Sequence, residues 1–316
     1  MARTLAGGMV LDDGPVLVTG AAGFAGRHLM YQLEMGAGDF ATDLGDSFEA
    51  PPGVARLTWR LPGGPVPDAL RGGARYIVHL AGVSSVAHSG MDAAGIYTVN
   101  TAGTAALLEW AASSSPGARI LFVSSSEVYG SSSGPLTESS PVAPRNAYGG
   151  SKAAAEEAVR QFARSSGMDI VIARPFPHFG PWQDTRFALP SFCRRILEAS
   201  RGGQPSISVG NLAPVRDYTY IGDVVEAYST LLARGRAGTV YNIASGEGRT
   251  MASILDILIG MSGSAVEAVP DASLLRESDI SVQVGSASRM EALGWRRRYT
   301  LEEGLRLLLG WWGERT

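Results

Sequence analysis

The chain has 316 residues, of which 45% are apolar and 18% are charged, and its net charge is −3 at pH 7. This composition excludes a disordered chain and offers no basic field for binding nucleic acid. The length suits two packed domains. Cys193 is the only cysteine, which excludes an internal disulfide and predicts a buried, inert thiol.

No apolar run approaches the roughly 18–20 residues that cross a bilayer. The first residues, MARTLAGGMVLDDG, carry acidic side chains where a signal peptide would need apolar ones. We therefore expect a soluble, cytoplasmic protein that binds neither membranes nor nucleic acid.

Short apolar segments alternate with longer helical ones along the first half of the chain. The predicted strands are residues 15–19, 39–42, 76–80, 120–123, 170–173 and 240–243. The predicted helices are residues 24–35, 93–112 and 148–165. Such alternation indicates βαβ units, so we expect an α/β fold with a Rossmann-type, doubly wound parallel sheet.

Prolines interrupt shorter elements from about residue 174 onward. We therefore predict a first domain over residues 1–173 and a smaller, irregular second domain over residues 174–316. The strand at 240–243 is expected to return to the first sheet, which makes the division discontinuous in sequence.

A glycine-rich turn separates the first predicted strand from the first helix. Gly20, Gly23 and Gly26 follow a GxxGxxG spacing, and Phe24 stands at the start of the helix. Glycines let the backbone approach a pyrophosphate, while the helix N-terminus supplies N–H groups and a positive dipole. The motif predicts a dinucleotide-binding loop, although glycine turns at such places also serve packing.

Asp43 ends the second predicted strand, 23 residues after Gly20. A carboxylate there can accept hydrogen bonds from an adenosine ribose diol and repel a 2′-phosphate. It therefore favours NAD(H), with NADP(H) still possible. The alternative interpretation is an ordinary turn aspartate.

The chain has a single lysine, Lys152, four residues after Tyr148 and therefore on the same face of the predicted helix. A phenol of pKa about 10 is a poor base at neutral pH, and a compact ammonium beside it would lower that pKa. The ammonium can also hold the ribose of a nicotinamide dinucleotide, a role for which the wide fork of arginine is a poor substitute. The pair predicts acid–base chemistry.

A serine-rich segment over residues 124–130 directly follows the predicted strand that ends at Val123. Open α/β sheets bind ligands at the carboxyl ends of their strands, so these hydroxyls are candidates for contacting a substrate. The alternative interpretation is an ordinary serine-rich turn. The segment alone favours that turn, and the site is favoured only when Tyr148 and Lys152 are considered with it.

Several motifs in the same order resemble the extended short-chain dehydrogenase/reductases that act on nucleotide sugars. They are the glycine turn at 20–26, HLAG at 79–82, NTAGT at 100–104, VSSSEVYG at 123–130, YxxxK at 148–152 and RP at 174–175. The resemblance implies that Tyr148 exchanges a proton with a sugar oxygen held by Ser125, beside Lys152. It also implies dinucleotide contacts at Leu44, Leu80, Ala81, Gly82, Asn100 and Pro175.

The second half is most similar to the GDP-4-keto-6-deoxy-D-mannose reductases, which are close relatives of GDP-mannose 4,6-dehydratases. The similar segments are residues 174–181, 209–212, 215–219, 223–228 and 275–279. The resemblance implies that Arg216 and Arg276 bind the diphosphate. It further implies substrate contacts at Ser84, Ser126, His178, Val209 and Asn211. His178 can instead pack in a loop, and Pro177 stands where the family usually has Asn.

Glu127 matches the carboxylate with which related dehydratases remove a sugar proton, although reductases of the group can also carry it. We predict an enzyme that reduces the C4 keto group of an NDP-4-keto-6-deoxyhexose, with a 4,6-dehydratase or a 4-epimerase that retains NAD as alternatives. A non-catalytic dinucleotide-binding regulator is least favoured. In the family, the helices matching 93–112 and 148–165 often form a dimer interface, so we expect a homodimer.

Overall fold

The computed structural model describes residues 3–5, 8–84, 91–203, 206–275 and 280–316. Seven strands of this part of the chain form one sheet in the order β13-β8-β7-β6-β3-β4-β5, with parallel pairing throughout. They are β3 (Val16–Thr19), β4 (Phe40–Asp43), β5 (Ala55–Thr58), β6 (Tyr76–His79), β7 (Arg119–Val123), β8 (Asp169–Pro175) and β13 (Val240–Ile243). The order reverses at β3, which confirms the predicted Rossmann-type sheet.

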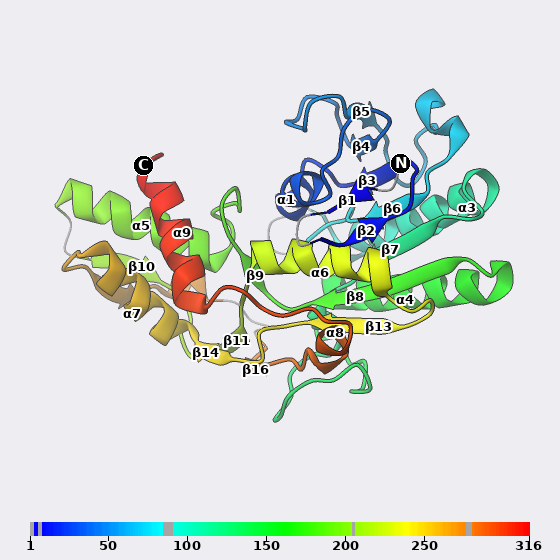
Figure 1. Ribbon diagram of the computed structural model, residues 1–316. Helices are drawn as coiled ribbons and strands as arrows, with labels where there is room; N and C mark the ends of the chain where they lie inside the picture. The colour runs from blue at the N-terminus through cyan, green and yellow to red at the C-terminus, as the bar shows by residue number, and fades with distance from the viewer. Residues whose placement is uncertain (1–2, 6–7, 85–90, 204–205, 276–279) are drawn as a thin grey trace.

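Helices cover both faces of this sheet (Figure 1). Helices α1 (Phe24–Gln32) and α6 (Ile221–Arg234) lie on one face, while α3 (Gly103–Ser114) and α4 (Ala147–Ser166) lie on the other. Neighbouring strand residues such as Leu17 and Val18 point into opposite cores. Burial on both faces explains why the strands appear in the sequence as continuous apolar runs.

The helix predicted over residues 93–112 is interrupted. Helix α2 (Ala93–Tyr97) passes into a π-helical turn, η2 (Thr98–Ala102), before α3 begins. Buried Asn100 lies in this turn. Such π-helical turns are rare and short, and the sequence analysis predicted one continuous helix here.

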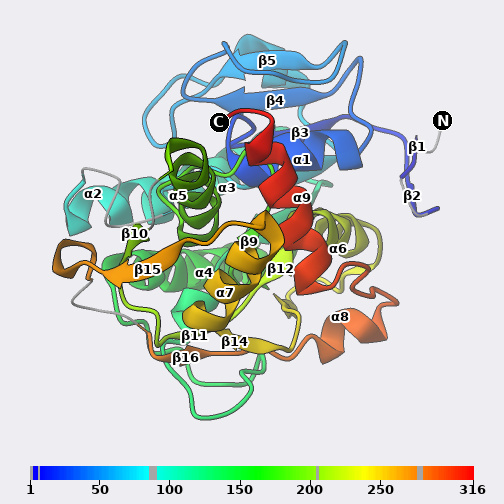
Figure 2. The same ribbon diagram turned by 90° about the vertical axis from the view of Figure 1, so that its left-hand side faces the viewer.

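The described part of the C-terminal region holds several small sheets and a separate helical core. Strand β10 (Ser206–Val209) pairs with β15 (Glu267–Pro270), β11 (Val215–Asp217) lies between β14 (Gly248–Thr250) and β16 (Val282–Gln283), and β9 (His178–Phe179) pairs with β12 (Thr219–Tyr220). Helices α5 (Ala188–Gly202), α7 (Met251–Ser262) and α9 (Leu301–Gly313) enclose a separate core (Figure 2). Cys193 is buried in that core, and burial raises the pKa of its thiol to about 12.

Residues 221–243 return to the first sheet from beyond the predicted boundary. Strand β13 pairs with β8, as expected for residues 240–243. Helix α6 returns with it and contributes Val224 and Leu231 to the core that α1 also joins. The division into residues 1–173 and 174–316 remains a proposal, with α6 and β13 packed on the first part.

The remaining described elements are short. They are β1 (Arg3–Thr4), β2 (Val10–Leu11), η1 (Asp68–Gly72), η3 (Ser126–Val128), η4 (Ala272–Leu274) and α8 (Ser288–Ala292). Strands β1 and β2 pair with each other in the antiparallel sense. Within the described ranges, no helix combines the length and the hydropathy that a membrane span requires.

Candidate active site

The glycine turn follows β3 and opens α1, at the point where the strand order reverses. Gly20 has a left-handed φ of 70°, and a Cβ there would lie 2.7 Å from the Ala81 nitrogen. A Cβ on Gly26 would collide with the Gly20 carbonyl oxygen. Gly23 is the exposed N-cap, and no described side chain caps the helix. The first N–H groups of α1 can therefore bind an anion.

Asp43 lies beside this turn at the end of β4. Its Oδ2 accepts a hydrogen bond from the Ala22 nitrogen at 3.0 Å, and its Oδ1 accepts one from the Leu44 nitrogen at 2.8 Å. These bonds fix the half-buried carboxylate next to the glycine turn. The Leu44 side chain is exposed, and its contact with a dinucleotide stays a prediction.

Residues 80–82 follow the end of β6 and lie close to Lys152. A Cβ on Gly82 would lie 2.7 Å from Asn100 Oδ1 and 3.5 Å from Lys152 Nζ. A side chain at position 82 would therefore displace the Asn100 amide, whereas Lys152 Nζ lies at van der Waals distance. This close approach brings the end of β6 and the middle of α4 to one place.

Asn100 joins the segment after β6 to α4. Its Oδ1 accepts a hydrogen bond from the Val83 nitrogen at 2.7 Å, while its Nδ2 donates to the Val83 oxygen at 3.2 Å and to Ser151 Oγ at 2.9 Å. Ser151 directly precedes Lys152 in the chain. The π-helical turn thus places an amide where it can hold both segments, which is how Asn100 would support the site.

Tyr148 and Ser125 meet at the carboxyl edge of the sheet. Tyr148 lies in the first turn of α4, and Ser125 follows β7. Burial and the Glu127 carboxylate raise the pKa of Tyr148, while a hydrogen bond with Ser125 lowers it. Because the upward effects are larger, the phenol stays protonated throughout the neutral range.

The direction of this shift is opposite to the one predicted from the Tyr148–Lys152 spacing. Lys152 Nζ donates to the Val123 carbonyl at 2.9 Å and lies 5.3 Å from the centroid of the Phe122 ring. Burial lowers the pKa of Lys152 to about 8, and the Glu156 carboxylate opposes this shift. The ammonium is thus bound to the end of β7.

Glu127 is held near Tyr148 by a residue that the sequence analysis missed. Asn146 caps α4: its Oδ1 accepts from the Gly149 nitrogen at 2.8 Å and its Nδ2 donates to Glu127 Oε2 at 2.7 Å. A Cβ on Gly149 would lie 2.5 Å from the Glu127 carbonyl oxygen. An asparagine just before a predicted helix is a cap signal that could have identified Asn146.

Ser126 connects the two regions of the molecule. Its buried hydroxyl donates to Gln283 Oε1 at 3.1 Å, and Gln283 Nε2 donates to the Ser126 carbonyl at 3.0 Å. Gln283 belongs to β16 and is distant in sequence, so no local pattern marks it. A direct contact between Ser126 and substrate stays a prediction.

A buried ion pair underlies the catalytic edge of the sheet. Arg174 donates to Glu156 through Nε at 2.8 Å and Nη2 at 2.6 Å, and Ser124 Oγ donates to the same carboxylate at 2.6 Å. Pro175 follows Arg174 at the buried end of β8. These bonds fix the ends of β7 and β8 against α4, one helical turn beyond Lys152.

The predicted substrate contacts are only partly brought together. The His178 ring stacks on Phe24 at a centroid distance of 5.8 Å and an interplanar angle of 12°, which links the C-terminal region to the glycine turn. Arg216 is half-buried on β11. Ser84 and Asn211 are exposed, whereas Val209 directs its side chain into the C-terminal core.

Arg276 lies outside the described residues, so its predicted contact with a diphosphate stays a prediction. Arg216 donates a hydrogen bond from Nη1 to the Val215 carbonyl at 3.1 Å, which orients its guanidinium along β11. Its role toward a diphosphate is likewise a prediction.

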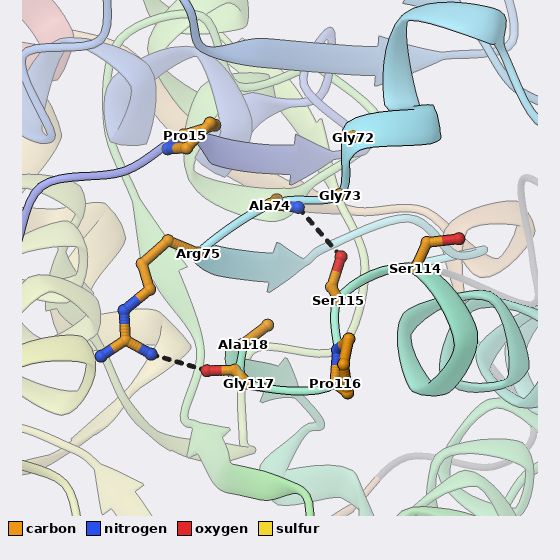
Figure 3. Close-up of a pocket in the computed structure, with 10 residues that line it drawn as sticks. All are labelled: Pro15, Gly72, Gly73, Ala74, Arg75, Ser114, Ser115, Pro116, Gly117 and Ala118. Atoms are coloured by element: carbon orange, nitrogen blue, oxygen red, sulfur yellow. Dashed lines mark hydrogen bonds between the residues drawn. The ribbon is translucent and has the colours of Figure 1, made fainter.

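A surface hollow of about 380 Å³ lies at the opposite edge of the sheet (Figure 3). Its polar groups are already engaged: the Ala74 nitrogen donates to Ser115 Oγ at 2.9 Å, and Arg75 Nη1 donates to the Gly117 carbonyl at 2.6 Å. Pro15 and Ala118 line it at the amino ends of β3 and β7. Parallel sheets bind ligands at their carboxyl ends, so this hollow is not the candidate site.

Comparison with known proteins identifies the family. The model of the family described as GDP-mannose 4,6 dehydratase matches residues 73–308. The chain belongs to this family. The predicted resemblance to nucleotide-sugar enzymes of the extended short-chain dehydrogenase/reductase type is therefore confirmed.

Relatives of different activity match nearly the whole chain. The GDP-6-deoxy-D-mannose reductase of Pseudomonas aeruginosa is 31% identical over 95% of this chain and 97% of its own length. RMD from Pseudomonas aeruginosa complexed with NADPH has a TM-score of 0.80 at 30% identity, covering 96% of this chain and 100% of that one. DesIV, a dTDP-glucose 4,6-dehydratase from Streptomyces venezuelae with NAD and TYD bound, has a TM-score of 0.82 at 29% identity, covering 95% and 97%.

Proposed function

We propose that this protein reduces the C4 keto group of an NDP-4-keto-6-deoxyhexose, with GDP-4-keto-6-deoxy-D-mannose as the favoured substrate. The observation that carries the proposal is the meeting of Tyr148, in the first turn of α4, with Ser125, which follows β7, at the carboxyl edge of the sheet. Reduction of a ketone needs a proton donor at the oxygen, and the Tyr148 phenol is one. The likeness to a GDP-6-deoxy-D-mannose reductase over 95% of the chain supports the same activity.

Ser125 and Tyr148 have different roles at the carbonyl oxygen of the substrate. When bound, the reduced nicotinamide supplies the hydride that the sugar C4 receives. Ser125 holds the carbonyl oxygen by a hydrogen bond, and Tyr148 transfers its phenolic proton to that oxygen as the carbon is reduced. The ketone becomes a secondary alcohol, the dinucleotide is oxidised, and the phenolate recovers its proton from solvent.

The residues around the glycine turn fit a nicotinamide dinucleotide. The uncapped N-terminus of α1 would bind the pyrophosphate, and the fixed Asp43 carboxylate would accept hydrogen bonds from the adenosine ribose. Lys152 would hold the nicotinamide ribose. Asp43 favours NAD(H), while the NADPH bound by RMD keeps NADP(H) possible.

A 4,6-dehydratase or 4-epimerase acting with retained NAD is the second candidate. Glu127 favours the dehydratase, since Asn146 holds its carboxylate near Tyr148. Both alternatives begin by oxidising a sugar hydroxyl, which needs a base. The predicted catalytic residues Ser125, Tyr148 and Lys152 argue against a non-catalytic regulator.

We also propose that the protein is a cytoplasmic homodimer. This proposal rests on the family resemblance, in which the helices that match the alanine-rich α3 and α4 often form a dimer interface. A dimer mass by light scattering at micromolar concentration is expected, and a monomer mass would contradict the assembly. The net charge of −3 gives no reason to expect a nucleic-acid partner.

The test is incubation of purified protein with GDP-4-keto-6-deoxymannose and either NADH or NADPH. We expect loss of reduced dinucleotide and a sugar product heavier by two hydrogens. GDP-mannose and other NDP-hexoses without added dinucleotide provide the comparison. Loss of water from them would identify a dehydratase, and an isomer of unchanged mass an epimerase; either result without reductase activity would overturn the proposal.

A further inference from the structure

The segment between β9 and α5 lies against one face of α1. His178 stacks on Phe24, and the Trp182 ring lies 4.8 Å from His28, centroid to centroid. His28 Nε2 also donates a hydrogen bond to the Pro181 carbonyl at 2.9 Å. Phe24 and His28 are one helical turn apart, so these contacts run along the beginning of α1 from its first residue.

Trp182 holds a backbone conformation that normally requires glycine. Its φ is 67°, and the Gln183 nitrogen donates to the Gly180 carbonyl at 3.3 Å. Pro181 and Trp182 are therefore the two central residues of a β-turn. A left-handed residue in third position is typical of a type II turn, where glycine or asparagine is favoured. A bulky side chain there costs free energy.

Burial in a core does not explain this tryptophan, because its side chain is 37% exposed. The partner that the structure shows for the ring is His28 on α1. Burial lowers the pKa of His28, so its ring is neutral near pH 7 and its Nε2–H remains bonded to the Pro181 carbonyl. The strained turn thus places the Trp182 ring against α1, the helix that follows the glycine turn.

We propose that Trp182, His28 and the Pro181 carbonyl form a clasp that controls entry and exit of the dinucleotide. This inference rests on the proposed function. The segment over residues 178–182 borders the N-terminus of α1, since His178 stacks on the residue that follows the N-cap Gly23. In this proposal the dinucleotide enters and leaves past this border, and the segment separates from α1 to let it through. Trp182 is a positioning residue here, without a role at the reacting atoms.

The clasp makes a kinetic prediction. It must open for both binding and release, so weakening it accelerates both rates and leaves the dissociation constant within about twofold. Aromatic pair energies correspond to rate increases of roughly 3- to 10-fold. A residue that contacted the dinucleotide directly would instead raise the dissociation constant.

The test uses the full chain and NADH as the probe. Stopped-flow fluorescence gives the association rate, and displacement by excess NAD⁺ gives the release rate. Trp182→Gly removes the ring and suits the left-handed turn, so we expect both rates to rise 3- to 10-fold without loss of thermal stability. His28→Ala should act similarly, and the double variant should be no faster than the faster single one. Trp182→Phe, which keeps a ring, should restore most of the slow release.

Tyr31→Ala is the matched control, because Tyr31 is an exposed aromatic residue on the same helix. Its rates should equal those of the wild type. Unchanged rates in Trp182→Gly, or multiplicative effects in the double variant, would overturn the clasp while leaving the proposed function intact. A wild-type protein that binds neither NADH nor NADPH would instead contradict the proposed function.

Discussion

The two regions of this protein position their predicted site residues in different ways. In the first region, the glycine turn follows β3, Asp43 ends β4 and Ser125 follows β7, so these residues stand where a strand ends. In the C-terminal region, Arg216 lies on a three-residue strand between partners from distant parts of the chain. The parallel sheet brings the first set of residues to one edge, whereas pairing between segments distant in sequence places Arg216.

Asp217 is the residue on which that second arrangement depends. Its buried carboxylate accepts hydrogen bonds from the Ser245 nitrogen at 2.8 Å, Ser245 Oγ at 2.6 Å, the Gly246 nitrogen at 2.9 Å and the Gly285 nitrogen at 3.1 Å. One side chain therefore joins β11 to the turn after β13 and to the residues after β16. Arg216 directly precedes Asp217 on β11, so the bonds of Asp217 also fix the backbone at Arg216.

The largest effect is expected in the first region, from Tyr148→Phe. Loss of the phenolic proton should lower kcat for keto-sugar reduction about 10²- to 10⁴-fold, with NADH affinity changed less than about twofold. Steady-state kinetics and fluorescence titration measure the two quantities. Tyr97→Phe is the control, because the Tyr97 hydroxyl also packs against α4, at Gly150. Equal losses in both variants would mean that the Tyr148 hydroxyl acts only through packing.

The fold and the first region could be predicted because their signals are local. Apolar strands, the glycine turn and the YxxxK spacing each occupy a few consecutive residues. The strands form one sheet, and the glycine turn and Tyr148 lie at its carboxyl edge. Gln283, Asp217 and Glu156 could not be found in this way, because their partners are distant in sequence or in another element. The direction of the Tyr148 pKa shift also depends on burial, which spacing does not report.

The second prediction tests the C-terminal arrangement through Asp217→Asn. An amide has one acceptor oxygen, so about two of the four donors lose their partner and meet an amino group instead. We expect the free energy of unfolding to fall by about 2–4 kcal/mol. Urea denaturation followed by far-UV circular dichroism measures it.

Ser245→Ala is the matched control for Asp217→Asn, since it removes a single hydrogen bond to the same carboxylate. Its cost should be about 1 kcal/mol. A loss in Asp217→Asn no larger than in this control would show that Asp217 does not organise the region.

The third prediction concerns the choice of dinucleotide, through Asp43→Ser. Removing the carboxylate should move the ratio of kcat/KM for NADH over NADPH about 10- to 100-fold toward NADPH, because a 2′-phosphate no longer faces a like charge. Asp46→Ser, in the exposed residues just beyond β4, should leave the ratio unchanged. An unchanged ratio in Asp43→Ser would make Asp43 a structural turn residue.

The smallest expected effect comes from pH and concerns Lys152. Burial lowers its pKa to about 8, so the ammonium predominates below pH 8 and is lost as the pH rises through that value. If the charged form holds the nicotinamide ribose, NADH affinity should fall up to roughly 10-fold between pH 7 and pH 9. Fluorescence titration across this range measures it.

Two variants separate Lys152 from other groups that titrate in this range. Lys152→Arg stays charged, so its affinity, although weaker, should not vary between pH 7 and pH 9. Glu156→Gln removes the carboxylate that raises the pKa of Lys152, so its loss of affinity should begin at lower pH. A wild-type NADH affinity that is constant to pH 9 would show that the charge of Lys152 does not affect binding. A Lys152→Arg profile with the same decline would show that another group titrates. Because Glu156 also binds Arg174, the Glu156→Gln profile tests whether the buried ion pair beneath the sheet reaches the dinucleotide site.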